Sequence, residues 1–163
     1  MSKNRLLTIM LCALSATACN PFHHSQAVQV SPGDATLNST WHANLASPAS
    51  LAGAVQMNGS ASMAPGPDGT HTVINISLAN ASPGGLHPWE AHEGQCSPGA
   101  DYGVFGSSDA YEQMKVDSDG RASGTATIPM SIPRSGGYFV VVYASEANSQ
   151  MVVACGNLAP PTR

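Results

Sequence analysis

The sequence predicts an all-β domain, an antiparallel barrel or sandwich of about seven to eight short strands. No stretch carries the periodicity of an amphipathic helix of useful length. The apolar runs are short, recur about every ten residues and are separated by turn signals. Gly and Pro together supply 28 of the 163 residues, whereas only 10% are charged. This composition is typical of a secreted β-protein.

The N-terminal residues 1–19 have the layout of a bacterial secretion signal. Lys3 and Arg5 form a basic start, and the apolar stretch after them is too short to span a bilayer as a stable helix. A run of small residues then ends at Cys19. This arrangement resembles a lipobox, although Ala16 stands where Leu is usual. Cys19 is therefore the predicted lipidation site, and simple cleavage is the alternative.

A lipid attached to Cys19 would anchor the protein to a membrane, and this membrane is the predicted partner. Asn20 is not Asp, which favours the outer membrane facing the periplasm, with a soluble periplasmic or secreted protein as the alternative. Residues 20–39 have no periodicity and are interpreted as a flexible tether. Without the leader, the chain carries four Lys and Arg against ten Asp and Glu, a net charge of −6. Such a surface repels nucleic acid, so we expect no nucleic-acid partner.

The cysteines outside the leader predict a disulfide. Cys12 lies inside the predicted signal and Cys19 is the predicted lipid site, which leaves Cys96 and Cys155. An even pair in an oxidising compartment is expected to be bonded.

The β domain is predicted over residues 40–159, with a short tail at 160–163. Residues 72–78 alternate cleanly between two faces, as a half-buried strand does. The Asp-Ser-Asp-Gly at 117–120 indicates a hairpin turn, and it lacks the further acidic ligands of a calcium loop. Further short β-type or apolar runs lie at 41–45, 51–55, 59–63, 114–116, 121–130, 138–144 and 151–155.

Residues 84–96 hold the densest group of reactive side chains. Side chains two apart in an extended strand share a face, so Glu90 and His92 should project side by side. His87 lies just upstream. An imidazole–carboxylate–imidazole group of this kind is a candidate divalent-metal site.

Four motifs resemble those of the copper–zinc superoxide dismutases, in the same order along the chain. Residues 85–93, Gly-Leu-His-Pro-Trp-Glu-Ala-His-Glu, resemble that family's Gly-Leu-His-Gly-Phe-His-Val-His-Glu. Residues 117–120 resemble its Asp-x-Asp-Gly hairpin, 137–143 its Gly-x-x-x-Val-Val-His strand, and 153–158 its terminal x-Ala-Cys-Gly-x-Ile. The resemblance runs from about residue 41 to residue 158. It implies an eight-stranded Greek-key β-barrel and is consistent with the predicted disulfide.

The metal ligands of that family are mostly replaced. Glu90 and Tyr143 stand where the resemblance implies copper-binding histidines, and only His92 is kept. The bridging histidine and the zinc ligands should lie within 96–117, which contains no His. Val152 stands at the position of the anion-guiding arginine. A single imidazole beside a carboxylate does not hold a copper that cycles between two oxidation states.

We therefore expect a dismutase-like envelope lipoprotein without dismutase activity or a metal cofactor, and with a binding or structural role. No catalytic residue is assigned. His87 is expected to hydrogen-bond backbone, and His92 to pair with Glu90 or Tyr143, whose hydroxyl could also donate to Glu90. The alternative is a periplasmic copper- or zinc-binding protein, or a weak superoxide dismutase, that uses His87, Glu90 and His92, with His71 nearby. The sequence does not identify a protein partner.

Overall fold

The computed structural model describes residues 39–53, 56–97 and 103–162. The predicted signal, the lipidation site Cys19 and residues 20–38 of the tether lie outside this range. The described chain forms nine strands and two single-turn 3-10 helices. Their bounds are β1 Trp41–Ala46, η1 Ala49–Leu51, β2 Asn58–Pro65, β3 Thr72–Ala79, β4 Leu86–His87, β5 Trp89–Glu93, η2 Ser108–Ala110, β6 Met114–Lys115, β7 Ala122–Ile128, β8 Tyr138–Ser145 and β9 Asn148–Leu158. None of the helices among the described residues has the length and apolar character needed to cross a membrane.

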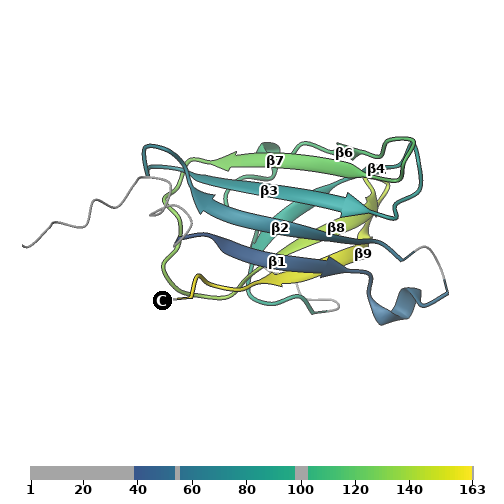
Figure 1. Ribbon diagram of the computed structural model, residues 1–163, viewed down its shortest axis with the longest axis horizontal. Coiled ribbons are helices and arrows are strands. Elements are labelled where there is room, and N and C mark those ends of the chain that lie inside the picture. The colour runs from purple at the N-terminus through teal and green to yellow at the C-terminus, as the bar shows by residue number, and fades with distance from the viewer. Residues whose placement is uncertain (1–38, 54–55, 98–102, 163) are drawn as a thin grey trace, which may run out of the picture.

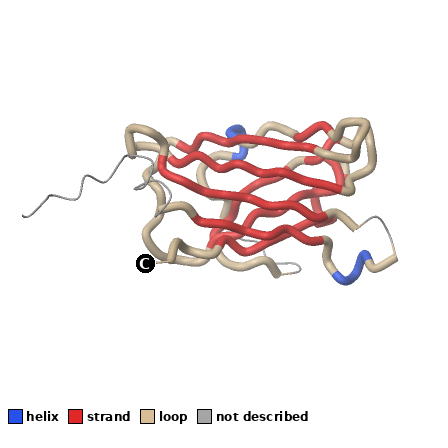
Figure 2. The backbone as a smooth tube through the Cα atoms, in the orientation of Figure 1, coloured by secondary structure: helices blue, strands red, loops and turns tan. Residues whose placement is uncertain are grey.

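Seven strands form one curled antiparallel sheet, in the order β5-β8-β9-β1-β2-β3-β7. In Figure 1, β7, β3, β2 and β1 form the near layer, and β8 and β9 run behind them. The chain leaves β3, crosses to β5 at the far edge, and later returns to place β7 beside β3. The tube in Figure 2 shows strands running almost throughout, joined by loops at the two ends. The prediction of an all-β barrel or sandwich is confirmed.

A second sheet contains only the two-residue strands β4 and β6. Leu86 pairs with Lys115, and His87 pairs with Met114. Strand β4 also packs beside β8, and β6 beside β7. These two pieces account for the difference between the nine strands observed and the seven to eight predicted, because strands of two residues leave no alternation to recognise.

The alternation along β3 sets which side chains enter the core. Thr72, Ile74, Ile76 and Leu78 are buried, as predicted for one face of this strand. The hydroxyl of Thr72 donates a hydrogen bond to the Met130 carbonyl oxygen at 2.8 Å, so this buried polar group is satisfied. A one-residue slip would expose the apolar set, which fixes the register with β2 and β7.

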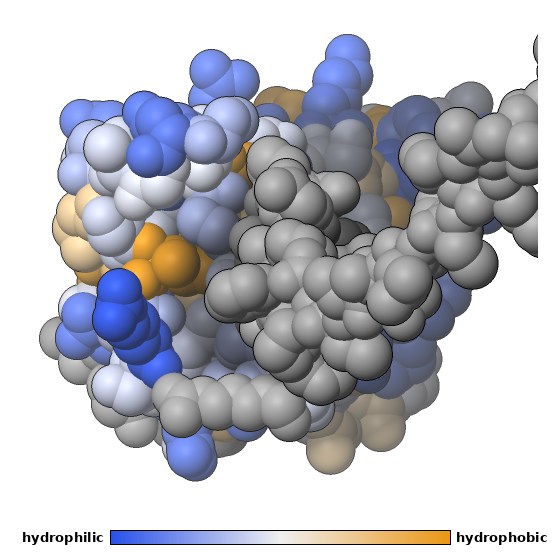
Figure 3. All heavy atoms as spheres, turned by 60° about the vertical axis from the view of Figure 1, so that its left-hand side comes forward, coloured by the Kyte–Doolittle hydropathy of each residue, from blue (hydrophilic) through white to orange (hydrophobic). Residues whose placement is uncertain are grey.

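The core fills the space between the two layers. Trp41 and Tyr138 meet edge to face with ring centroids 5.6 Å apart, and Phe105 meets Tyr138 at 5.4 Å. The largest fully buried side chains are Trp41, Trp89, Met63, Ile74, Met114, Ile128, Val116, Val140 and Val142, with Thr72 beside them. The described atoms of the face drawn in Figure 3 are mostly hydrophilic to neutral, with orange confined to small areas.

Two local predictions differ in part from the structure. The turn at 117–120 is confirmed, because Asp117 N–H donates to the Arg121 carbonyl oxygen at 2.8 Å and Gly120 has a φ of 74°. Its flanking strands, however, pair elsewhere, β6 with β4 and β7 with β3. The apolar run predicted at 51–55 begins inside η1 rather than in a strand, because Pro48 and Ala49 turn the chain there.

Candidate functional site

Strand β5 places Glu90 and His92 on the same face, as predicted, and this is the outer face of the curled sheet. Trp89 and Ala91 alternate with them and point into the core. Glu90 pairs with Val141 and His92 with Phe139 across to β8. The His92 ring stacks on Phe139, with centroids 5.3 Å apart and planes 19° from parallel. This stacking partner was not predicted, although residues 138–144 were recognised as a strand.

Three side chains meet on this face and form what we call the Glu90–His92–Tyr143 cluster. His92 Nε2 lies 3.2 Å from Glu90 Oε2 and 3.2 Å from the Tyr143 hydroxyl oxygen. The predicted pairing of His92 is therefore confirmed for both candidates. The hydrogen bond suggested from Tyr143 to Glu90 is replaced by a contact with His92. The Tyr143 hydroxyl lies against the His92 imidazole.

His92 Nε2 contacts both Glu90 and Tyr143, and these contacts determine whether this nitrogen carries a hydrogen. A carboxylate only accepts hydrogen bonds, so contact with Glu90 requires a hydrogen on His92 Nε2. The hydrogen bond from His92 is the main cause that holds the pKa of the Glu90 carboxyl below its ordinary value, against the opposing effect of burial. Burial, and then the charge of Glu90, raise the pKa of the Tyr143 hydroxyl. At neutral pH the cluster thus contains an ionised Glu90 and a neutral Tyr143.

His87 points away from this cluster into the barrel. It is buried, and its Nδ1 lies 2.9 Å from the Tyr143 carbonyl oxygen, to which it must donate. The expected backbone hydrogen bond is therefore present, and it ties β4 to β8. His87 Nε2 is buried and has no partner among the described residues. A Cβ on Gly85 would lie 2.9 Å from this nitrogen, so the chain passes close over the ring.

The residues do not fit a copper–zinc pair. The described chain holds no group of three or more His, Cys, Asp or Glu side chains placed to share one metal ion. His71, considered as a neighbour, instead lies 2.8 Å from Asp68 in the turn between β2 and β3. The metal set of His87, Glu90 and His92 stays a prediction, and in this geometry two of its members meet while the third hydrogen-bonds backbone.

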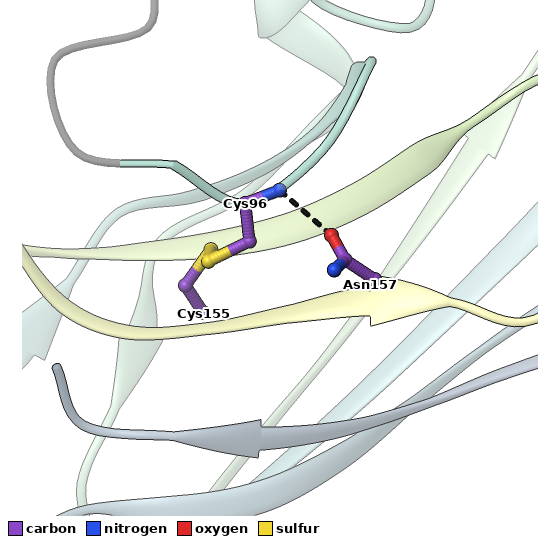
Figure 4. The surroundings of a disulfide bond; sticks show 3 residues. All are labelled: Cys96, Cys155 and Asn157. Carbon is purple, nitrogen blue, oxygen red and sulfur yellow. Dashed lines mark hydrogen bonds between the residues drawn. A yellow bond between two sulfur atoms is a disulfide. The ribbon is translucent and has the colours of Figure 1, made fainter.

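The Cys96–Cys155 disulfide is present, as predicted. Figure 4 shows it joining the loop after β5 to β9. The same loop is held by a second contact, in which the Cys96 backbone N–H donates to Asn157 Oδ1 at 2.7 Å. Sequence reasoning missed this role of Asn157, since nothing in its neighbourhood marks the amide as a partner of a distant backbone group.

Two buried aromatic side chains support the cluster from inside the barrel. The indole Nε1 of Trp89 donates to the Glu112 carbonyl oxygen at 2.9 Å, and its ring meets Tyr111 edge to face at 5.1 Å. The Tyr111 hydroxyl donates to the Phe105 carbonyl oxygen at 2.6 Å. Trp89 therefore both packs in the core and holds the loop after η2 against β5 through this hydrogen bond.

No family model and no curated protein matches this chain. The resemblance to copper–zinc superoxide dismutases stays a prediction that rests on the four sequence motifs and their order.

Proposed function

We propose that this chain is a dismutase-like envelope lipoprotein that binds a ligand and does not dismutate superoxide. The observation that carries the proposal is the double contact of His92 Nε2, which lies 3.2 Å from both Glu90 and Tyr143. A metal ligand needs a lone pair that faces an open coordination position. Here the nitrogen faces a carboxylate that requires its hydrogen, so a metal would have to displace that contact.

The charges near the cluster also speak against superoxide as a substrate. Superoxide is an anion, and Glu90 is an ionised carboxylate beside His92. Val152 stands at the position of the family's guiding arginine and lies directly opposite Tyr143 in the register of β8 and β9. An aliphatic side chain at this position adds no attraction for an anion.

The test is the metal content and the superoxide turnover of protein purified from the periplasm. We expect substoichiometric copper and zinc, and no turnover above that of buffer after copper is added. The matched control is the His92→Ala variant, which should give the same values as the natural chain. One tightly held copper per chain, with turnover lost in His92→Ala, would refute the proposal.

A further inference from the structure

A groove opens on the outer side of β8 and β9, beside η1. Its volume is about 860 Å³, within the range of sites for small organic molecules. The larger apolar side chains of its lining are Leu51, Phe139, Val141, Met151 and Val152, and the polar Ser50 and Gln150 lie beside them. Met151 is 40% exposed, so its side chain is accessible from solvent at the rim of this space. We call this space the apolar hollow.

A smaller hollow of about 270 Å³ adjoins it. Tyr143 and Ser149 line both spaces, so the two hollows lie side by side, and we call the pair the recess. The smaller space is lined by two acidic residues, Glu90 and Glu146, and by the tyrosines Tyr111 and Tyr143. We call it the acidic hollow. The recess thus changes from apolar to acidic along its length, with Tyr143 at the boundary.

Neither a Lys nor an Arg side chain balances the two carboxylates of the acidic hollow within the described lining. Glu90 has a contact with His92, whereas Glu146 is exposed and forms no ion pair within the described part of the chain. Carboxylates beside aromatic faces are the groups that recognise an ammonium ion, by charge and by cation–π attraction.

We propose that the recess binds a small amphiphile that has an apolar body and one ammonium group. The inference rests on the proposed function, which it deepens by naming the class of ligand. The apolar body occupies the apolar hollow against Phe139 and Val141. The ammonium group lies beside Tyr143 and faces Glu90 and Glu146. A neutral or anionic amphiphile of the same length fills the first space equally well but gains nothing in the second.

Three probes of equal length separate these classes, namely hexylammonium, 1-hexanol and hexanoate. Each is titrated into the full chain labelled for NMR, and the shifts of the His92 and Tyr143 rings are followed. We expect hexylammonium to bind about tenfold tighter than 1-hexanol, which corresponds to about 1.4 kcal/mol, and hexanoate to bind more weakly than both. The preference for hexylammonium should fall as salt is added.

Matched variants locate the two ends of the ligand. Glu146→Gln should weaken hexylammonium about three- to tenfold and leave 1-hexanol unchanged. Met151→Ser should weaken all three probes by similar factors. Glu93→Gln is the control, since Glu93 lies on the same strand as Glu90 but lines neither hollow, and it should change nothing.

Two results would overturn the proposal. Equal affinity for hexylammonium and 1-hexanol, or an unchanged affinity in Glu146→Gln, would remove the ammonium from the ligand class. The lack of any shift at His92 and Tyr143 with all three probes would remove the recess as a site. Neither result depends on metal content or superoxide turnover. The amphiphile site can therefore be refuted while the protein is still found not to dismutate superoxide, and the reverse is also possible.

Discussion

The hydroxyl oxygen of Tyr143 lies 3.2 Å from His92 Nε2, although the two residues are 51 positions apart in the sequence. Strands β5 and β8 pair directly and bring these side chains to the same outer face. Glu90 completes the cluster from the neighbouring position on β5. By the motif resemblance, Glu90 and Tyr143 both stand where a dismutase has histidine. If the resemblance holds, these are the positions of three imidazoles, of which only His92 is present.

Histidines introduced at positions 90 and 143 should create a copper site. In the Glu90→His/Tyr143→His variant, three imidazoles would face one point, and no carboxylate would demand the hydrogen of His92. We expect copper affinity to rise by roughly a hundredfold or more over the natural chain, which corresponds to about 2.8 kcal/mol. Isothermal titration with Cu(II) and the visible absorption of the bound metal measure the change.

The control for this experiment removes the imidazole that the natural chain already has. Adding His92→Ala to the double variant should abolish most of the gain, because two imidazoles hold copper far less tightly than three. Equal copper affinity in the double variant and the natural chain would mean that the three positions do not converge as the structure places them.

The Glu90–His92 contact should make stability depend on pH in the acidic range. The pKa of Glu90 lies below its ordinary value of 4.5 in the folded protein, chiefly because His92 donates to it. A carboxyl with a lowered pKa contributes stability that is fully present above the unfolded value. That contribution is lost as the pH falls through the folded pKa, because the unfolded chain binds the proton more readily.

The Glu90→Gln variant isolates this contribution. At pH 7 we expect it to lower the free energy of unfolding by about 1 kcal/mol, since the pair is only partly buried. The difference between natural chain and variant should shrink toward zero as the pH falls below the ordinary glutamate pKa and through the lowered pKa of folded Glu90. Urea unfolding at a series of pH values measures it. A difference that stays constant over this range would show that the carboxylate charge is not what the contact uses.

The sequence predicted the fold where alternation was long enough to read. The alternation in residues 72–78 predicted which side chains share each face of the strand, and in β3 the predicted apolar face is the buried one. The two-residue strands β4 and β6 carry no such period, and their pairing depends on how the chain crosses from β3 to β5. The turn at 117–120 was readable from its Asp and Gly, but the partners of the strands on either side depend on the whole sheet.

The site was predictable only as far as local spacing reaches. The shared face of Glu90 and His92 follows from the two-residue period of a strand. The approach of Tyr143 was reached through the motif resemblance, and no local pattern gives it. The stacking of Phe139 under His92 and the contact of Asn157 with Cys96 depend on strand register. The recess could not be predicted, because the segments that line it are far apart in the sequence and meet only in the folded chain.

A side chain at position 124 should clash with the aromatic support of β5. A Cβ on Gly124 would lie 2.8 Å from Trp89 Nε1 and 3.1 Å from the side chain of Met114. The indole cannot retreat without losing its hydrogen bond to the Glu112 carbonyl oxygen. We expect Gly124→Ala to lower the free energy of unfolding by about 1–3 kcal/mol, measured by urea unfolding followed through tryptophan fluorescence.

Gly103→Ala is the matched control for this substitution. A Cβ at Gly103 meets no atom of the described residues within 4 Å, so we expect a change within about 0.5 kcal/mol. If Gly124→Ala proved as mild as Gly103→Ala, the indole would not be held where the structure places it.

The disulfide should contribute more to stability than any single contact in the cluster. It joins residues 59 positions apart, and closing a loop of that length in the unfolded chain is worth about 4 kcal/mol in the chain-entropy model. We expect the Cys96→Ser/Cys155→Ser variant to lose stability of that order. Asn157→Ala, which removes only the hydrogen bond to the Cys96 N–H, should cost about 1 kcal/mol. Denaturant unfolding with and without a thiol reductant measures both.

The reductant should destabilise the natural chain and leave the double Ser variant unchanged. A natural chain that unfolds at the same denaturant concentration in both conditions would mean that the bond does not constrain the unfolded state.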